Sequence, residues 1–207
     1  MTILTPSTCV KTSGPQRVLL RITACAGLAA AWFAVGQSSA PPSAEPQPTE
    51  TQVKASYLYN FARFVTWPVV KDDLATPMTI CVFHAAEIAP VLRSAVADQT
   101  VEGKGIAVKV IEQPGETAGC GMLFIGSPAD GRFDALMQSV AGRCVLTVSD
   151  IAGFTERGGM IEFVMEGAQV RFKVGLAAAQ KANLKLSSQL LKVAQSVVGI
   201  PGTEARP

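Results

Sequence analysis

The chain has 207 residues, of which 48% are hydrophobic and 16% are charged, and its 18 Lys and Arg nearly balance its 16 Asp and Glu. Three of the basic residues lie in the first 40 positions, so the rest of the chain carries 15 Lys and Arg against the same 16 acidic residues. This balance gives no electrostatic basis for binding nucleic acid.

The N-terminal segment has the layout of a secretory signal peptide. Lys11, Arg17 and Arg21 precede an apolar run at residues 22–35, and small residues follow it. We therefore predict that residues 1–40 direct export and that cleavage occurs between positions 36 and 44. Residues 41–50 are rich in proline and predict a flexible lead-in. Residues 51–198 are expected to form one domain, and residues 199–207 a tail.

The first predicted element of the domain is an aromatic helix at residues 53–67. Thr49 and Gln52 fit a capping box at its start, and Pro68 ends it. Its aromatic side chains either pack on the domain core or form a face for a partner or for a second copy. The residues of this candidate partner face are Tyr57, Phe61, Phe64 and Trp67.

Strands and helices then alternate along the chain. Strands are predicted at residues 78–83, 105–111, 122–125 and 144–148, and helices at residues 87–96 and 132–140. This alternation predicts an α/β fold with a doubly wound, mostly parallel, Rossmann-like sheet. Residues 160–165 and 169–174 are expected to add a β-hairpin. Helices at residues 176–182 and 187–198 are expected to close the chain.

Polar side chains follow several of these strands, where the ligands of open α/β sheets bind. His84, Ser127, Ser149 and Asp150 define a candidate crevice there. They suggest a hydrolase triad only superficially, because Ser127 and Asp130 fit a helix capping box and Asp150 suits a turn. His84 is the only histidine, and no Gly-x-Ser-x-Gly stretch exists. We expect no catalytic residue.

Metal and nucleotide sites also lack their usual residues. A single histidine and the absence of paired cysteines at ligand spacing leave zinc without a ligand set. The glycines around residues 122–125 flank a strand and do not open a helix, as a dinucleotide or P-loop motif requires. We therefore expect no metal and no cofactor. Gly153, Gly158 and Gly159 are expected to let the chain reverse between two strands.

Three cysteines, Cys81, Cys120 and Cys144, lie beyond the predicted signal peptide. In an oxidising compartment, an odd number predicts one bridge with a spare thiol, or an intermolecular bond. All three lie in or beside strands that we expect to be neighbours, so the local sequence does not choose among the three pairings.

Several stretches taken together resemble the YfiR family of periplasmic proteins. The resemblance extends over residues 52–194 and rests on VKASYLYNFARFVTWP, ICVF, LFIGS, VLTVSDIAGFTERGGMIEFV and VRFKVGLAAAQKANLKLSSQLLKVA. The combination is specific, although no single motif would suffice. One departure is Gly175, where the family pattern more often has Asn.

The resemblance implies a periplasmic, non-enzymatic regulator that forms a homodimer. Its implied partner is the periplasmic domain of an inner-membrane diguanylate cyclase or a related sensor, which it would hold inactive, lowering cyclic di-GMP signalling and biofilm formation. The resemblance also implies a disulfide between Cys81 and Cys120, with Cys144 as the spare thiol. The alternative is a periplasmic small-ligand binding protein or sensor that uses the candidate crevice.

Overall fold

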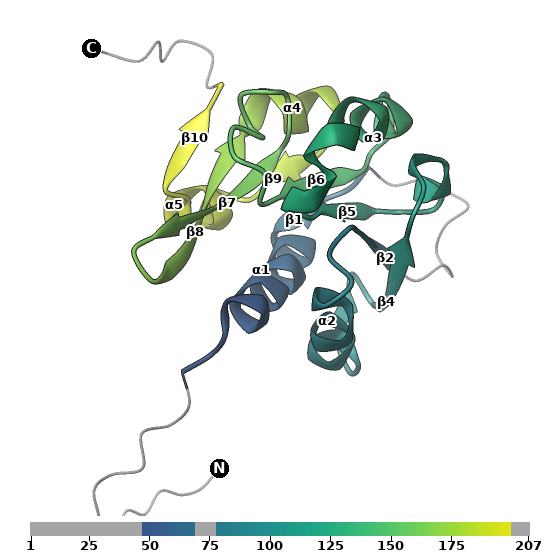
Figure 1. Ribbon diagram of the computed structural model, residues 1–207, viewed down its shortest axis with the longest axis vertical. Coiled ribbons are helices and arrows are strands. Elements are labelled where there is room, and N and C mark those ends of the chain that lie inside the picture. The colour runs from purple at the N-terminus through teal and green to yellow at the C-terminus, as the bar shows by residue number, and fades with distance from the viewer. Residues whose placement is uncertain (1–46, 69–77, 200–207) are drawn as a thin grey trace, which may run out of the picture. The chain divides into compact units, whose positions relative to one another are not determined.

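The computed structural model describes residues 47–68 and 78–199 (Figure 1), so the predicted signal peptide and the last eight residues of the predicted tail lie outside it. The described helices are α1 (Glu50–Phe64), α2 (Ile88–Val96), α3 (Phe133–Val140), α4 (Leu176–Lys181) and α5 (Ser188–Val193), with 3-10 turns η1 (Pro114–Thr117) and η2 (Ser127–Arg132). The described strands are β1 (Val65–Thr66), β2 (Met78–Phe83), β3 (Thr100–Val101), β4 (Lys104–Ile111), β5 (Met122–Ile125), β6 (Leu146–Ser149), β7 (Ile161–Glu166), β8 (Gln169–Gly175), β9 (Lys185–Leu186) and β10 (Ser196–Val198).

The main sheet of the described chain has eight strands in the order β10-β8-β7-β6-β5-β2-β4-β3. Strands β4, β2, β5, β6 and β7 run parallel to one another, and β10 is parallel to β8. The antiparallel pairs are β7 with β8 and β3 with β4. The mixed α/β class and the mostly parallel sheet are therefore confirmed.

Helices cover both faces of the sheet, because the buried strands place apolar side chains on each face in turn. In β2, Ile80 and Val82 join the hydrophobic cluster under α1 and α2, whereas Cys81 and Phe83 join the cluster under α3. Strand β5 repeats this alternation. The cluster under α1 contains most of the described phenylalanines, so the aromatic helix packs on a large apolar surface.

The aromatic helix has the predicted capping box, but it begins at Glu50, before the predicted range of residues 53–67, and it ends earlier. Thr49 and Gln52 form the predicted capping box, and the helix ends at Phe64. Val65 and Thr66 then form β1, which pairs with β9 from a distant part of the sequence. The prediction that the helix extends to residue 67 is wrong because this pairing takes over the backbone hydrogen bonds.

The last predicted helix is wrong in its second half. Ser187 caps α5 by accepting the N–H of Leu190 at 3.2 Å, but the helix ends at Val193. Residues 196–198 instead form β10 along the outer edge of β8, and Gln195 begins the pairing by donating its N–H to the carbonyl of Phe172 at 2.8 Å. The open edge of β8 therefore decides the structure of this segment.

Candidate functional site

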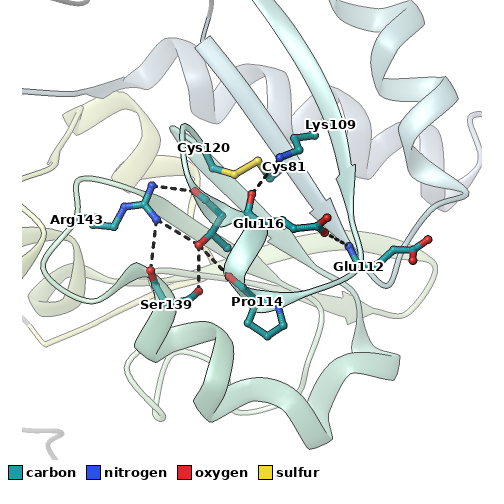
Figure 2. The surroundings of a disulfide bond; sticks show 9 residues. Cys81, Lys109, Glu112, Pro114, Glu116, Cys120, Ser139 and Arg143 are labelled. Carbon is teal, nitrogen blue, oxygen red and sulfur yellow. Dashed lines mark hydrogen bonds between the residues drawn. A yellow bond between two sulfur atoms is a disulfide. The ribbon is translucent and has the colours of Figure 1, made fainter.

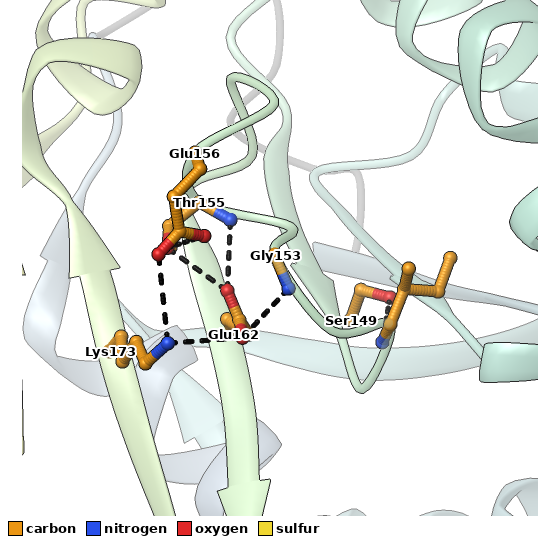
Figure 3. Close-up of polar contacts among 7 residues, drawn as sticks. Ser149, Gly153, Thr155, Glu156, Glu162 and Lys173 are labelled. Carbon is orange, nitrogen blue, oxygen red and sulfur yellow. Dashed lines mark hydrogen bonds and ion pairs between the residues drawn. The ribbon is translucent and has the colours of Figure 1, made fainter.

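The loop at residues 150–160 packs Ile151 and Phe154 into the hydrophobic cluster under α3, on the face of the sheet opposite α1. The buried carboxylate of Glu162, on β7, holds this loop (Figure 3). It accepts the main-chain N–H of Gly153 at 3.1 Å and of Thr155 at 3.1 Å, and Lys173 Nζ lies 3.4 Å from it. The Thr155 hydroxyl is 3.0 Å away. The Glu162 side chain therefore fixes residues 153–155 of the loop to β7.

Burial by itself would raise the pKa of Glu162, but the hydrogen bonds from Thr155 and Gly153 and the charge of Lys173 outweigh it and lower the pKa below its usual 4.5. A carboxyl group with a lowered pKa in the folded state stabilises the fold while it is ionised. This stabilisation is complete above the pKa of the unfolded chain and is lost as the pH falls through the lower pKa of the folded protein.

We expect Glu162→Gln to destabilise the domain by about 1 to 3 kcal/mol at pH 7, because an amide cannot accept all the bonds that the carboxylate accepts. The variant should also lose stability less steeply than the wild type as the pH falls below about 5. Chemical denaturation between pH 7 and pH 4 measures both effects. Glu166→Gln, at the exposed end of the same strand, is the matched control. Equal pH slopes in the wild type and in Glu162→Gln would contradict this role.

A second polar group joins α1 to the carboxyl ends of β5 and β6. Asp150 accepts the main-chain N–H of Ser127 at 2.6 Å through Oδ1 and the ammonium group of Lys54 at 2.6 Å through Oδ2. Lys54 also pairs with Glu50 at 2.7 Å. Burial would lower the pKa of Lys54, but its bonds to Asp150 and Glu50 raise it, so the ammonium stays charged at neutral pH.

This arrangement corrects two roles predicted from the sequence. Ser127 makes no side-chain cap bond, because the 3-10 turn begins at Ser127 itself and Gly126 takes the N-cap position. The turn after β6 is held by Ser149, whose hydroxyl accepts the N–H of Ile151 at 3.0 Å and donates to the carbonyl of Ile125 at 2.7 Å. Asp150 links strands and a helix and does not close its own turn.

We expect Ser127→Ala to change the free energy of unfolding by less than about 0.5 kcal/mol, because only its main-chain N–H is used. Asp150→Ala should cost about 1 to 3 kcal/mol, since that N–H and the Lys54 ammonium lose their acceptor. Urea denaturation of the two variants, side by side, tests the difference. A larger loss of stability in Ser127→Ala would mean that the Ser127 hydroxyl stabilises the fold.

The structure brings together only part of the candidate crevice. A pocket of about 350 Å³ lies at this edge of the sheet, and the described residues that line it are Glu50, Lys54, Ser127, Asp150, Ala152, Glu162, Phe163, Val164 and Met165. Ser149 is fully buried and is not among the lining residues. His84 is exposed at the end of β2 and is not among the lining residues. Two of the four predicted residues, Ser127 and Asp150, therefore share one pocket.

The candidate partner face is divided between core and surface. Phe61 is fully buried, with its ring 5.7 Å from that of Phe163 and 5.0 Å from that of Phe172. Tyr57 is half-buried on the same cluster, and the half-buried Trp67 donates its indole N–H to the carbonyl of Gly121 at 3.1 Å. Phe61 has no surface to offer a partner, because the sheet covers it completely.

A disulfide joins Cys81 on β2 to Cys120, just before β5, with a Cα–Cα distance of 5.7 Å (Figure 2). This is the pairing that the family resemblance implies. Arg143 supports the loop that carries Cys120 by donating to the carbonyl of Thr117 at 2.8 Å. Among the cysteines that the structure describes, Cys144 is left as a half-buried thiol.

Gly175, where the sequence departs from the family pattern, lies where the backbone is crowded. A Cβ atom at this position would lie 2.3 Å from the carbonyl oxygen of Gly159. Gly159 in turn packs against the ring of Phe154, where a Cβ would lie 2.0 Å from the ring. An Asn at 175, as the family pattern more often has, would therefore require the loop at residues 150–160 to lie differently.

Sequence reasoning missed the two charged residues that organise this site. A signal for Glu162 was present, because an acid within the apolar stretch MIEFV occupies a strand position that must be buried and needs a partner. No comparable signal marked Lys54, which lies on the polar side of a helix. Within residues 47–68 and 78–199, no cluster of three metal-ligating side chains occurs and no helix is long and apolar enough to span a membrane.

A family model described as YfiR/HmsC-like matches residues 51–195. Two solved structures are more distantly similar. The ABC domain in complex with L-Trp from Streptococcus pneumonia shares 12% identity over 61% of this chain and 57% of that chain, with a TM-score of 0.45. A conserved domain protein from Vibrio cholerae shares 8% identity over 72% of this chain and 60% of that chain, with a TM-score of 0.49. The chain thus spans less than two thirds of either protein, and similarity at this level identifies no function. No curated protein matches the chain.

Proposed function

The chain belongs to the YfiR/HmsC-like family, and from this membership we propose that it is a periplasmic regulator that binds the periplasmic domain of an inner-membrane diguanylate cyclase and holds it inactive. The observation that carries the proposal is the family match, which extends over residues 51–195 and so includes nearly all the described chain. Repression would lower cyclic di-GMP and biofilm formation. Export by the N-terminal segment and homodimer formation are parts of the same proposal.

The polar residues of the candidate site favour regulation by contact over catalysis. Asp150 and Glu162 both accept main-chain N–H groups and pair with lysines, so they hold the fold together. A general acid or base needs a proton-accepting atom directed at a substrate. Here the carboxylate oxygens of both residues already have protein donors.

Deletion of the gene in its native organism tests this proposal. We expect cellular cyclic di-GMP and surface attachment to rise, and both to return to wild-type levels when the full chain is supplied from a plasmid. A version lacking residues 1–40 is the control, because it should stay in the cytoplasm and fail to complement. Unchanged cyclic di-GMP after deletion would contradict the proposal.

A second candidate, a small-ligand binding protein or sensor, is favoured by the pocket beside Asp150. Its volume of about 350 Å³ falls in the lower part of the range of small-molecule sites. Thermal denaturation of the purified domain with periplasmic metabolites would test it. A ligand that raises the melting temperature of the wild type, but not that of a Val164→Trp variant with a filled pocket, would support this function.

A further inference from the structure

Strand β7 extends further than β6, its neighbour on the side away from β8. It pairs with β8 along its whole length, from Ile161 to Glu166. With β6 it pairs only at Ile161 and Glu162. Within the described part of the chain, no strand pairs with residues 163–166 on the β6 side. The sheet therefore contains an internal stretch of uncovered edge.

The turn after β6 creates this uncovered edge. Ser149 is the last residue of β6, and its hydroxyl both donates to the carbonyl of Ile125 and accepts the N–H of Ile151. The chain is thereby drawn away from β7, and Asp150 is held toward α1 by Lys54. A buried hydrogen-bonded serine thus ends β6 while β7 continues past it.

The direction of the main-chain groups on β7 follows from its pairing with β8. Gly175 donates its N–H to the carbonyl of Met160 at 2.7 Å, so the main-chain groups of residue 160 point toward β8. In an antiparallel pair this direction alternates with each residue. The N–H and C=O of Met165 therefore point away from β8, toward the side that β6 leaves open.

The pocket lies along this same edge. Four consecutive residues of β7, at positions 162–165, line it. Side chains alternate between the two faces of a strand, so four consecutive lining residues mean that the pocket borders the strand's edge and not one face. Met165 is 51% exposed, although its side chain is large and apolar. An apolar side chain and a free main-chain edge thus lie side by side.

We propose that an extended segment of the membrane partner binds here by adding a short strand to the free edge of β7 at Met165. The inference rests on the proposed function and names its contact surface. Strand addition uses unpaired main-chain groups for affinity and neighbouring pockets for side-chain selection. Met165 selects an apolar side chain. Glu50 and Asp150 share a single cation, Lys54, so the rim of the pocket has an excess negative charge that selects Lys or Arg.

The partner is a better source of this strand than the chain's own lead-in. Residues 41–48, which precede α1, include Pro41, Pro42, Pro46 and Pro48. Proline has no N–H to donate to a neighbouring strand and is confined to the outer positions of sheets. A segment with four prolines in eight residues cannot form the ladder that the edge of β7 offers.

The test uses the purified domain and the periplasmic domain of a diguanylate cyclase encoded in the same genome, with binding measured by calorimetry. Met165→Pro removes the N–H that faces the pocket and leaves the bonds to β8 in place, and should weaken binding by about tenfold or more. Met165→Leu keeps the main chain and is the matched control, expected to bind within about twofold of the wild type. Melting temperatures of both variants show whether the fold is intact.

Two further measurements separate strand addition from other contacts. Hydrogen exchange of the Met165 amide, followed by NMR, should slow when the cyclase domain binds, because only a main-chain bond protects this group. Glu50→Lys should weaken binding by about tenfold if the partner's residue is basic. If Glu50→Lys binds more tightly than the wild type, the partner residue at this rim is not basic.

The results that would contradict this inference differ from those that would contradict the proposed function. If the wild type binds and represses the cyclase, but Met165→Pro binds normally and the Met165 amide exchanges at its free rate, strand addition at β7 is wrong and the function stands. If Met165→Pro changes only the oligomeric state, the edge belongs to a second copy and the inference is also wrong. If the wild type does not bind and deletion leaves cyclic di-GMP unchanged, both proposals fail.

Discussion

Removing the bridge between Cys81 and Cys120 is expected to lower the free energy of unfolding by about 4 kcal/mol, because the bond closes a loop of about 40 residues in the unfolded chain. The two cysteines are 39 positions apart, and both are buried in the cluster under α3. A loss of this size is a large part of the stability of a domain of this length, which is about 5 to 15 kcal/mol. Cys81→Ser and Cys120→Ser should therefore show equal and large decreases in melting temperature.

The spare cysteine gives the control for this prediction. Cys144→Ser changes the same atoms at a half-buried thiol without opening a loop, and should cost much less. Peptide mapping without reduction first establishes the bond in the exported protein. If a peptide with Cys144 bonded to either residue is found, the pairing is wrong. Single serine variants with wild-type stability and full repression would remove any role for the bridge.

Phe61→Ala is expected to destabilise the domain by about 3 to 5 kcal/mol, because it leaves a cavity in the aromatic part of the core. The side chain is fully buried. Its ring lies within 6 Å of those of Tyr57, Phe163 and Phe172, so the cavity would separate α1 from both β7 and β8. Urea denaturation measures the loss.

A second aromatic residue of α1 provides the comparison. Phe64 is only half-buried, at the end of the helix, where Arg63 lies over its ring. Phe64→Ala should therefore cost clearly less than Phe61→Ala. If Phe61→Ala leaves the melting temperature unchanged and still abolishes repression, Phe61 acts in recognition and its place in the core does not matter for stability.

The sequence by itself determined the elements whose signals are local. Strands β2 and β5 have the predicted bounds, because each is a short apolar run between turn residues and is buried on both faces. The start of α1 was determined by Thr49 and Gln52, which satisfy helix N–H groups within three residues. The α/β class followed from the alternation of such segments, which leaves few other ways to bury them.

Only the tertiary structure decided the features that join distant segments. Residues 196–198 are a strand because β8 offers an open edge, and residues 65–66 leave the helix because β9 lies beside them. Ser127 contributes its main chain to Asp150, 23 positions away, where its own sequence predicts a cap. Local propensities differ by less than about 1 kcal/mol per residue, so one hydrogen bond or one buried contact with a distant segment is enough to override them.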